Sequence, residues 1–132
     1  MIYPSLSIII PCYNEKNTIK NIIEKVINVK PSNKQIIVVD DYSNDGSIEE
    51  IKKIVKLYPD LHVIFHNQNF GKGKAIRSGL DAVKNEVVII QDADLEYDPS
   101  EYLNLMLPFI DAQADVVYGS RFLGNQKYTR IH

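Results

Sequence analysis

The sequence is poor in several features that would each point to a particular class of protein. Its 132 residues include a single cysteine, Cys12, which excludes an internal disulfide and fits a reducing compartment. No apolar run approaches the roughly 18 residues of a membrane-spanning helix, and no signal peptide is expected. The formal charge of −2 gives no general affinity for nucleic acid. We therefore expect a cytoplasmic globular protein, either free or peripheral at the cytoplasmic face of the membrane.

What the chain does contain is an alternation of two apolar patterns, without internal repeats or linkers. Short runs rich in valine and isoleucine are typical of strands covered on both faces. Between them, apolar residues recur at the i, i+3, i+4, i+7 spacing of amphipathic helices. The expected strands are 6–10, 35–39, 61–65, 86–90 and 115–118, and the expected helices lie around 19–27, 48–58, 75–83 and 102–110. This alternation predicts an α/β fold with a parallel sheet and right-handed crossovers.

Two of the expected helices have clear starting signals. Ser47 with Glu50 three residues later matches a capping box. Asp98, Pro99 and Glu101 put a carboxylate at the N-cap, proline at N1 and a second acid at N3.

The polar clusters share one place in this pattern, because each follows an expected strand. They are PCYNE (11–15), DDYSNDGS (40–47), HNQNFGKGKA (66–75), QDADLEYD (91–98) and GSR (119–121). In an open parallel sheet the loops that follow the strands share one edge, and ligands bind at that edge. The convergence therefore predicts a binding site.

The cluster after the fourth expected strand is suited to a cation. If residues 92 to 96 are extended, Asp92, Asp94 and Glu96 point to one side of the chain. Carboxylates so close together repel one another unless a cation lies between them, and oxygen ligands favour Mg²⁺ or Mn²⁺ over zinc. A lone D-x-D is common in surface turns, so the position after a buried strand is what favours a metal here.

The cluster after the third expected strand combines glycine with positive charge. Gly71 and Gly73 permit close approach to the backbone just before a helix, whose N-terminus attracts anions, and Lys72 adds a cation. The spacing matches neither a Walker loop nor G-x-G-x-x-G. A phosphate contact and a solvated turn remain equally open. His62 and His66 have a spacing that a strand does not align, so neither is assigned a role.

The first and last clusters offer groups suited to a nucleotide. Arg121 can grip a diphosphate in two places, although a surface arginine near the chain end is the alternative. Tyr13 can pack on a base, and Glu15 can accept a hydrogen bond from a base or ribose. Asn14 or Asn17 can at the same time cap the helix that follows.

The three carboxylates of VVDDYSNDGS (38–47) admit several interpretations. An EF-hand calcium loop counted from Asp41 fails, because its twelfth residue is a lysine and a strand precedes it. A phosphoacceptor receiver domain fails because its acidic pair follows the first strand. The remaining interpretation is a nucleotide loop in which Asp41 accepts a hydrogen bond from base or ribose. Asp45 and Ser47 then shape the turn and start the helix, and Asp40 has no assigned role.

With these residues placed, the sequence resembles family 2 glycosyltransferases of the GT-A fold. The closest branch in this resemblance is the dolichyl- and polyprenyl-phosphate sugar transferases, dolichol-phosphate mannose synthase among them. The carrying motifs, which run in the family's order, are IIIPCYNE, VVDDYSNDGS, NFGKGKAIRSG, QDADLEYDP and ADVVYGSRF. The resemblance implies a Rossmann-like, mostly parallel sheet with helices on both faces, within a domain over 1–124 that a polar tail, 125–132, follows.

The resemblance also implies a GDP- or UDP-linked sugar donor and Mg²⁺ or Mn²⁺. The residues expected to bind the nucleotide sugar are Pro11, Tyr13, Glu15, Val39, Asp41, Lys72, Asp92, Ala93, Asp94 and Arg121. Metal ligands would be Asp92, Asp94 and Glu96, and catalysis would rest on Asp92, Asp94 and Arg121. One departure is Tyr42, where the family often has glycine.

The implied reaction is an inverting transfer of a hexose to a polyprenyl or dolichyl phosphate, or to a glycan. Family members continue well beyond GSRF, so the chain is expected to be the donor-binding half. The alternative is a nucleotide-sugar-binding module without turnover. An unpaired sheet edge would favour a homo-oligomer, or a partner chain would supply the missing half. A nucleotidyltransferase is disfavoured because no glycine-rich, basic loop follows the first strand.

Overall fold

The computed structural model describes residues 5–93, Pro99, Tyr102 and 115–119. In this part of the chain, five strands alternate with three helices. The strands are β1 (Leu6–Cys12), β2 (Lys34–Asp40), β3 (His62–Phe65), β4 (Val87–Gln91) and β5 (Asp115–Gly119), and the helices are α1 (Ile19–Asn28), α2 (Ser47–Leu57) and α3 (Lys72–Asp81). All five predicted strands are confirmed to within two residues. The helix expected over 102–110, with its start at Asp98–Glu101, lies outside the described residues except for Pro99 and Tyr102.

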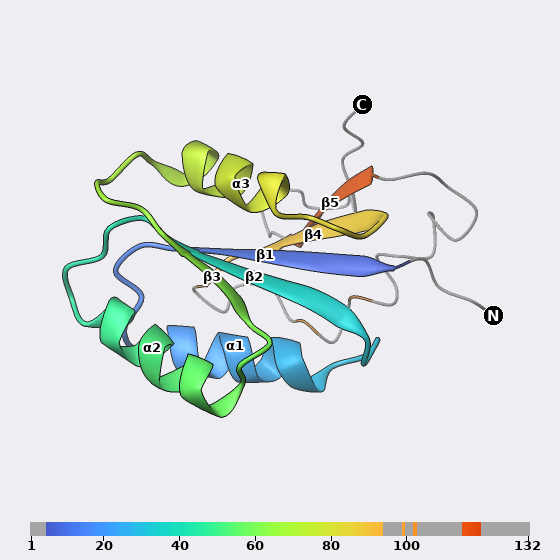
Figure 1. Ribbon diagram of the computed structural model, residues 1–132, viewed down its shortest axis with the longest axis horizontal. Helices are drawn as coiled ribbons and strands as arrows, with labels where there is room; N and C mark the ends of the chain where they lie inside the picture. The colour runs from blue at the N-terminus through green and yellow to red at the C-terminus, as the bar shows by residue number, and fades with distance from the viewer. Residues whose placement is uncertain (1–4, 94–98, 100–101, 103–114, 120–132) are drawn as a thin grey trace.

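The strands form a single parallel sheet in the order β3-β2-β1-β4-β5. The chain runs outward from the central strand β1 to β3, then returns through α3 to β4 on the other side of β1 (Figure 1). The connections therefore diverge at the carboxyl ends of β1 and β4. This is the topological switch point at which open α/β sheets bind ligands.

Helices cover both faces of the sheet, and each face has its own apolar layer. α1 and α2 lie on one face and α3 on the other (Figure 1). Side chains alternate between the two layers: Ile8 and Ile10 of β1 join the layer beneath α1 and α2, whereas Ile9 joins the layer beneath α3. Because both faces are buried, the strands read as continuous apolar runs instead of alternating with polar residues.

At Gly79, α3 approaches β1 more closely than a side chain at that position would allow. A Cβ built at Gly79 would lie 2.6 Å from Cγ2 of Ile9, well inside van der Waals contact. The glycine thus sets the distance between helix and sheet. Because α3 begins beside the carboxyl edge of the sheet, this close packing also fixes where its first turn lies.

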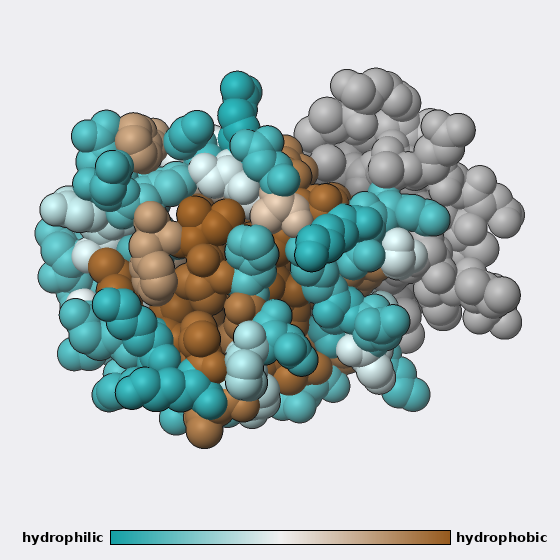
Figure 2. Space-filling model, in the orientation of Figure 1, coloured by the Kyte–Doolittle hydropathy of each residue, from teal (hydrophilic) through white to brown (hydrophobic). Residues whose placement is uncertain are grey.

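At the β3 edge of the sheet, apolar side chains remain partly uncovered. Figure 2 shows them gathered between α3 and α2 within a border of hydrophilic residues. Phe65 of β3 is 42% exposed, and Nζ of Lys52 from α2 lies 5.8 Å from the centre of its ring. None of the helices in the described part of the chain has the length and apolarity needed to cross a membrane.

The predicted capping box at the start of α2 is wrong. The N-cap is Gly46, in a left-handed conformation with φ +106°, and Ser47 is already the first helical residue. Asp45 takes the capping role, since its Oδ1 accepts both the N–H of Ser47 at 2.9 Å and the Ser47 hydroxyl at 2.6 Å. The prediction that Asp45 and Ser47 shape this turn is confirmed.

Candidate functional site

A cavity of about 330 Å³ opens at the carboxyl edge of the sheet. Its walls come from the segments that follow β1, β2, β3 and β4, so four of the five predicted polar clusters meet there. The lining residues are Pro11, Cys12, Tyr13, Glu15, Asp41, Asn69, Gly71, Lys72, Ala75, Asp92 and Ala93. Seven of them, namely Pro11, Tyr13, Glu15, Asp41, Lys72, Asp92 and Ala93, are residues that the sequence predicts for a nucleotide sugar. The segment after β5 lies outside the described residues.

The alternation of side chains along β2 places Asp40 and Asp41 on opposite sides of the sheet. On β2, Val38 lies in the layer beneath α1 and α2, and Val39 lies in the layer beneath α3. Continuing this period of two, Asp40 follows the first side and Asp41 the second. Val39 is fully buried in its apolar layer and does not line the cavity.

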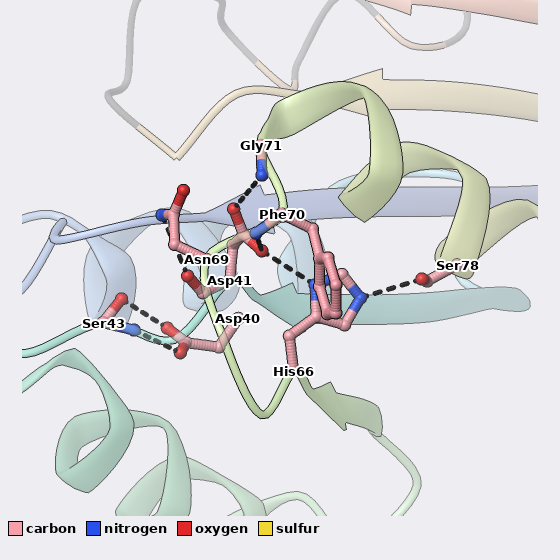
Figure 3. Close-up of polar contacts among 8 residues, drawn as sticks. All are labelled: Asp40, Asp41, Ser43, His66, Asn69, Phe70, Gly71 and Ser78. Atoms are coloured by element: carbon pink, nitrogen blue, oxygen red, sulfur yellow. Dashed lines mark hydrogen bonds and ion pairs between the residues drawn. The ribbon is translucent and has the colours of Figure 1, made fainter.

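Asp40 stabilises the loop that follows it through hydrogen bonds to Ser43. Its carboxylate is fully buried and accepts both the N–H of Ser43 at 2.9 Å and the Ser43 hydroxyl at 2.6 Å (Figure 3). Between these residues, Tyr42 adopts φ +67°, a left-handed conformation that glycine accommodates more readily than tyrosine. The acid without a predicted role therefore holds the turn at which this chain departs from the family pattern.

The loops after β1 and β2 are bonded to each other along their length. The N–H of Asn14 donates to Oγ of Ser43 at 2.9 Å, and the N–H of Asn44 donates to Oδ1 of Asn14 at 2.8 Å. Farther on, the N–H of Glu15 donates to Oγ of Ser47 at 2.9 Å. We call residues 12–18 and 40–47 the paired loops; together they carry Glu15 in the cavity wall.

Asp41 is the centre of a different set of contacts. Its carboxylate, 4% exposed, accepts hydrogen bonds from His66 Nδ1 at 2.8 Å and from the N–H groups of Phe70 at 2.9 Å and Gly71 at 2.7 Å (Figure 3). Burial alone would raise the pKa of Asp41, but these hydrogen bonds and the nearby imidazole outweigh it and hold the pKa below its usual range. The carboxylate is therefore ionised and its orientation is fixed.

The segment that joins β3 to α3, residues 66–72, is called here the glycine loop. Gly71 has φ +98°, and nothing lies within 4 Å of a Cβ added at Gly71 or Gly73. A ligand can thus reach this backbone without meeting a side chain. Nζ of Lys72, the first residue of α3, forms an ion pair with Oδ1 of Asp92 at the end of β4.

Thr18 joins the first loop to the segment after β4, a contact that the sequence does not predict. Its hydroxyl donates to the carbonyl of Ala93 at 2.6 Å. Thr18 is also the N-cap of α1, without a side-chain capping bond, so the predicted caps Asn14 and Asn17 are wrong. A lone threonine before a helix resembles an ordinary cap, and only the fold reveals its distant partner.

The remaining predicted site residues fall beyond the described part of the chain. Asp94 and Glu96, expected to ligate a metal with Asp92, lie outside it, as does Arg121. Among the residues that the structure describes, no three histidine, cysteine or acidic side chains gather into a metal site.

Cys12 lies at the floor of the cavity and is 1% exposed. Burial, aided by the negative charge of Asp40, raises the pKa of its thiol to about 12. The thiol is therefore neutral and a poor nucleophile at physiological pH.

Similar proteins share both the sequence pattern and the fold. The chain is 30% identical over 123 residues to a dolichol-phosphate mannosyltransferase of Pyrococcus furiosus, covering 92% of this chain and 34% of that protein. It is 36% identical over 109 residues to an undecaprenyl-phosphate 4-deoxy-4-formamido-L-arabinose transferase of Pectobacterium atrosepticum. This match covers 77% of this chain and 32% of that protein. The chain thus spans about a third of the length of the curated relatives that it matches.

Two solved structures with the same GT-A arrangement illustrate the likeness. The mannosyltransferase PcManGT of Pyrobaculum calidifontis, in complex with GDP-Man and Mn²⁺, has a TM-score of 0.69 at 25% identity, over 78% of this chain and 31% of that one. S. aureus TarS 1-349 in complex with UDP-GlcNAc has a TM-score of 0.68 at 26% identity, over 81% of this chain and 31% of that one. The sequence profile of "Glycosyl transferase family 2" matches residues 7–132. The chain therefore belongs to glycosyl transferase family 2.

Proposed function

We propose that the cavity binds the nucleotide-diphospho-sugar donor of an inverting hexosyl transfer to a polyprenyl or dolichyl phosphate. One observation carries this proposal: a fixed, ionised carboxylate lies beside an open glycine backbone and a lysine in a single cavity at the switch point of the sheet. A nucleotide sugar presents both kinds of complementary group, hydrogen-bond donors on the nucleoside and anionic oxygens on the diphosphate. Names of similar proteins, including complexes with GDP-Man and UDP-GlcNAc, support the same class of ligand.

The nucleoside end lies at Asp41 and the paired loops. A carboxylate offers about four acceptor positions, and three protein donors contact Asp41, so one position remains for a base N–H or ribose hydroxyl. Tyr13, which is 46% exposed in the cavity wall, can pack on the base. Glu15 is held beside it by Ser47 and offers a second acceptor.

The diphosphate end lies between the glycine loop and β4. Lys72 and the backbone at Gly71 would contact the phosphates, with Arg121 as a further cation. Asp92 fits a hard cation, since it supplies only oxygen and already attracts the Lys72 ammonium. Asp92, Asp94 and Glu96 would hold Mg²⁺ or Mn²⁺, which when bound supplies positive charge to the leaving diphosphate.

The acceptor end follows from the names of similar proteins, which are dolichol-phosphate and undecaprenyl-phosphate sugar transferases. A polyprenyl or dolichyl phosphate is already ionised near neutral pH and needs no general base, so the chain's task would be to orient donor and acceptor. Such an acceptor would place the reaction at the cytoplasmic face of the membrane. Because the chain spans about a third of its relatives, a module that binds the donor without turnover is the second candidate.

Calorimetry with GDP-mannose and UDP-glucose tests the proposal. We expect at least one sugar nucleotide to bind with Mn²⁺, and EDTA to weaken binding at least about tenfold. Asp94→Ala should remove the metal-dependent part of the affinity for the sugar nucleotide. Asp60→Ala, which replaces an exposed acid after α2, should leave that affinity unchanged. Absence of binding by every sugar nucleotide would sink the proposal. Transfer to polyprenyl phosphate, measured with the same protein, separates an enzyme from a binding module.

A further inference from the structure

Behind Asp41, a line of polar side chains runs away from the cavity and joins three separate elements. Nδ1 of His66, just after β3, lies 2.8 Å from Oδ1 of Asp41, and Nε2 of the same ring lies 2.8 Å from Oγ of Ser78 in α3 (Figure 3). The side chains of His66 and Asp41 are only 8% and 4% exposed. The contacts are thus largely shielded from water, which strengthens each hydrogen bond.

The hydrogen bonds determine which ring nitrogen carries the proton. An ionised carboxylate only accepts, so Nδ1 of His66 must be protonated to contact Asp41. In the neutral ring, Nε2 then accepts from the hydroxyl of Ser78. The donors are therefore aligned in one direction, from Ser78 through His66 to Asp41.

His66 also braces the glycine loop, through its backbone and its ring. Its backbone N–H donates to the carbonyl of Asp40 at 2.9 Å, which joins the start of the loop to the end of β2. Phe70 packs edge-on against the imidazole, with ring centres 5.2 Å apart, and its N–H donates to Asp41. The N–H of Gly71 donates to Asp41 as well. The glycine loop therefore surrounds a carboxylate whose other contact is the His66 ring.

The order of the three groups is that of a serine hydrolase triad, but its orientation is reversed. Asp41 lines the cavity, whereas neither His66 nor Ser78 does. A nucleophilic serine must face the substrate. This line of side chains instead presents its carboxylate to the ligand and its serine to the helix.

We propose that His66 is a positioning residue for the nucleotide site: with its proton held on Nδ1 by Asp41 and its ring anchored by Ser78, it holds Asp41 in the orientation that receives the nucleoside and packs against Phe70 of the glycine loop. This inference rests on the proposed function, because it assigns the ligand at Asp41 to a nucleoside. His66 acts only through Asp41 and does not contact the ligand.

Substitutions at His66 can separate positioning from general packing. Asn places its amide N–H near the position of Nδ1, whereas Gln reaches toward Nε2. We expect His66→Ala and His66→Gln to weaken binding of GDP and UDP, each measured with Mn²⁺, by roughly tenfold or more. His66→Asn should stay within about threefold of the unchanged chain, and Ser78→Ala should lose about twofold to threefold. His62→Asn, at an exposed histidine that begins β3, is the matched control and should bind normally.

Two further readouts keep the test independent of folding. Thermal unfolding shows whether each variant is folded, and ¹⁵N NMR of the imidazole should find the proton on Nδ1 of His66. Equal losses in folded His66→Asn and His66→Ala would overturn the inference, as would unchanged binding by His66→Ala or a proton found on Nε2 alone. If His66→Ala does not fold, His66→Asn and Ser78→Ala decide. If the unchanged chain binds neither GDP nor UDP, the proposed function fails and this inference with it.

Discussion

The paired loops and the glycine loop line one cavity but are held in place in different ways. The paired loops are joined mainly by backbone N–H groups that donate to neutral side-chain oxygens, such as those of Ser43, Ser47 and Asn14. The glycine loop is held through the carboxylates of Asp41 and Asp92, which also line the cavity. A ligand therefore meets a preformed wall on one side and, on the other, groups whose present partners it can supplement or replace.

This difference has a physical consequence for substitutions. Removing a group that bonds only within the paired loops should mainly lower the free energy of unfolding. Removing a group of the glycine loop should mainly lower affinity for the ligand, because the bonded groups are the ones proposed to contact it. The following experiments test that division, from the largest expected effect to the smallest.

Asp40→Ala should have the largest effect on stability. It would leave the buried N–H and hydroxyl of Ser43 without their acceptor and place a small cavity in the core, at a cost of about 3 kcal/mol. Urea unfolding measures the change, with Asp60→Ala as an exposed control. A loss below about 1 kcal/mol would mean that Asp40 does not hold the paired loops together.

Gly71→Ala tests the glycine loop. The backbone at Gly71 has φ +98° and ψ 162°, a region essentially reserved for glycine, so alanine should cost about 2 kcal/mol and shift the N–H away from Asp41. Gly73→Ala is the matched control, because Gly73 does not line the cavity, its φ is not positive and a Cβ there would meet no other atom. We expect affinity for GDP or UDP to fall in Gly71→Ala alone. Equal affinity in both variants would contradict the assignment.

Acid should weaken both walls through Asp41 and Asp45. For Asp45, hydrogen bonds from Ser47 and Lys16 outweigh the effect of burial and lower the pKa, as other donors do for Asp41. Folded-state pKa values below the ordinary value of 3.8 contribute stability that is present above that pH and is lost as pH falls through the lower folded values. Unfolding free energies measured from pH 7 down to about pH 2 follow this loss. Asp45→Asn should make the unfolding free energy depend less steeply on pH. If its pH dependence is identical to that of the unchanged chain, Asp45 does not contribute to the loss in acid.

Lys72→Met should have the smallest effect on stability. The lysine side chain is 56% exposed, so its ion pair with Asp92 is worth at most about 0.5 kcal/mol. Affinity for GDP should nevertheless fall several-fold, and the dependence of binding on salt should become weaker. Lys74→Met, the next lysine along α3, is the control. A large stability loss without an affinity change would place Lys72 in the scaffold instead.

Periodicity was enough to predict the sheet, because both of its faces are buried and the apolar runs are therefore unbroken. It also located the polar clusters, since parallel strands carry the segments that follow them to one edge. The sequence singled out Asp41 for a ligand, but it gave Asp40 no role. Nor could it find His66, whose partners Asp41 and Ser78 lie 25 and 12 positions away.

The sequence by itself thus determined the strands, their parallel direction and the edge at which Pro11, Tyr13, Glu15, Lys72 and Asp92 gather. The role of Asp40 and the partners that hold Asp41 were decided only by tertiary structure. The physical reason is the period of two along β2: it directs Asp40 toward α1 and α2, where Ser43 meets it, and Asp41 toward α3, where His66 and the glycine loop close around it. A side chain's role depends on which face of the sheet each helix covers, and the local sequence carries no record of that choice.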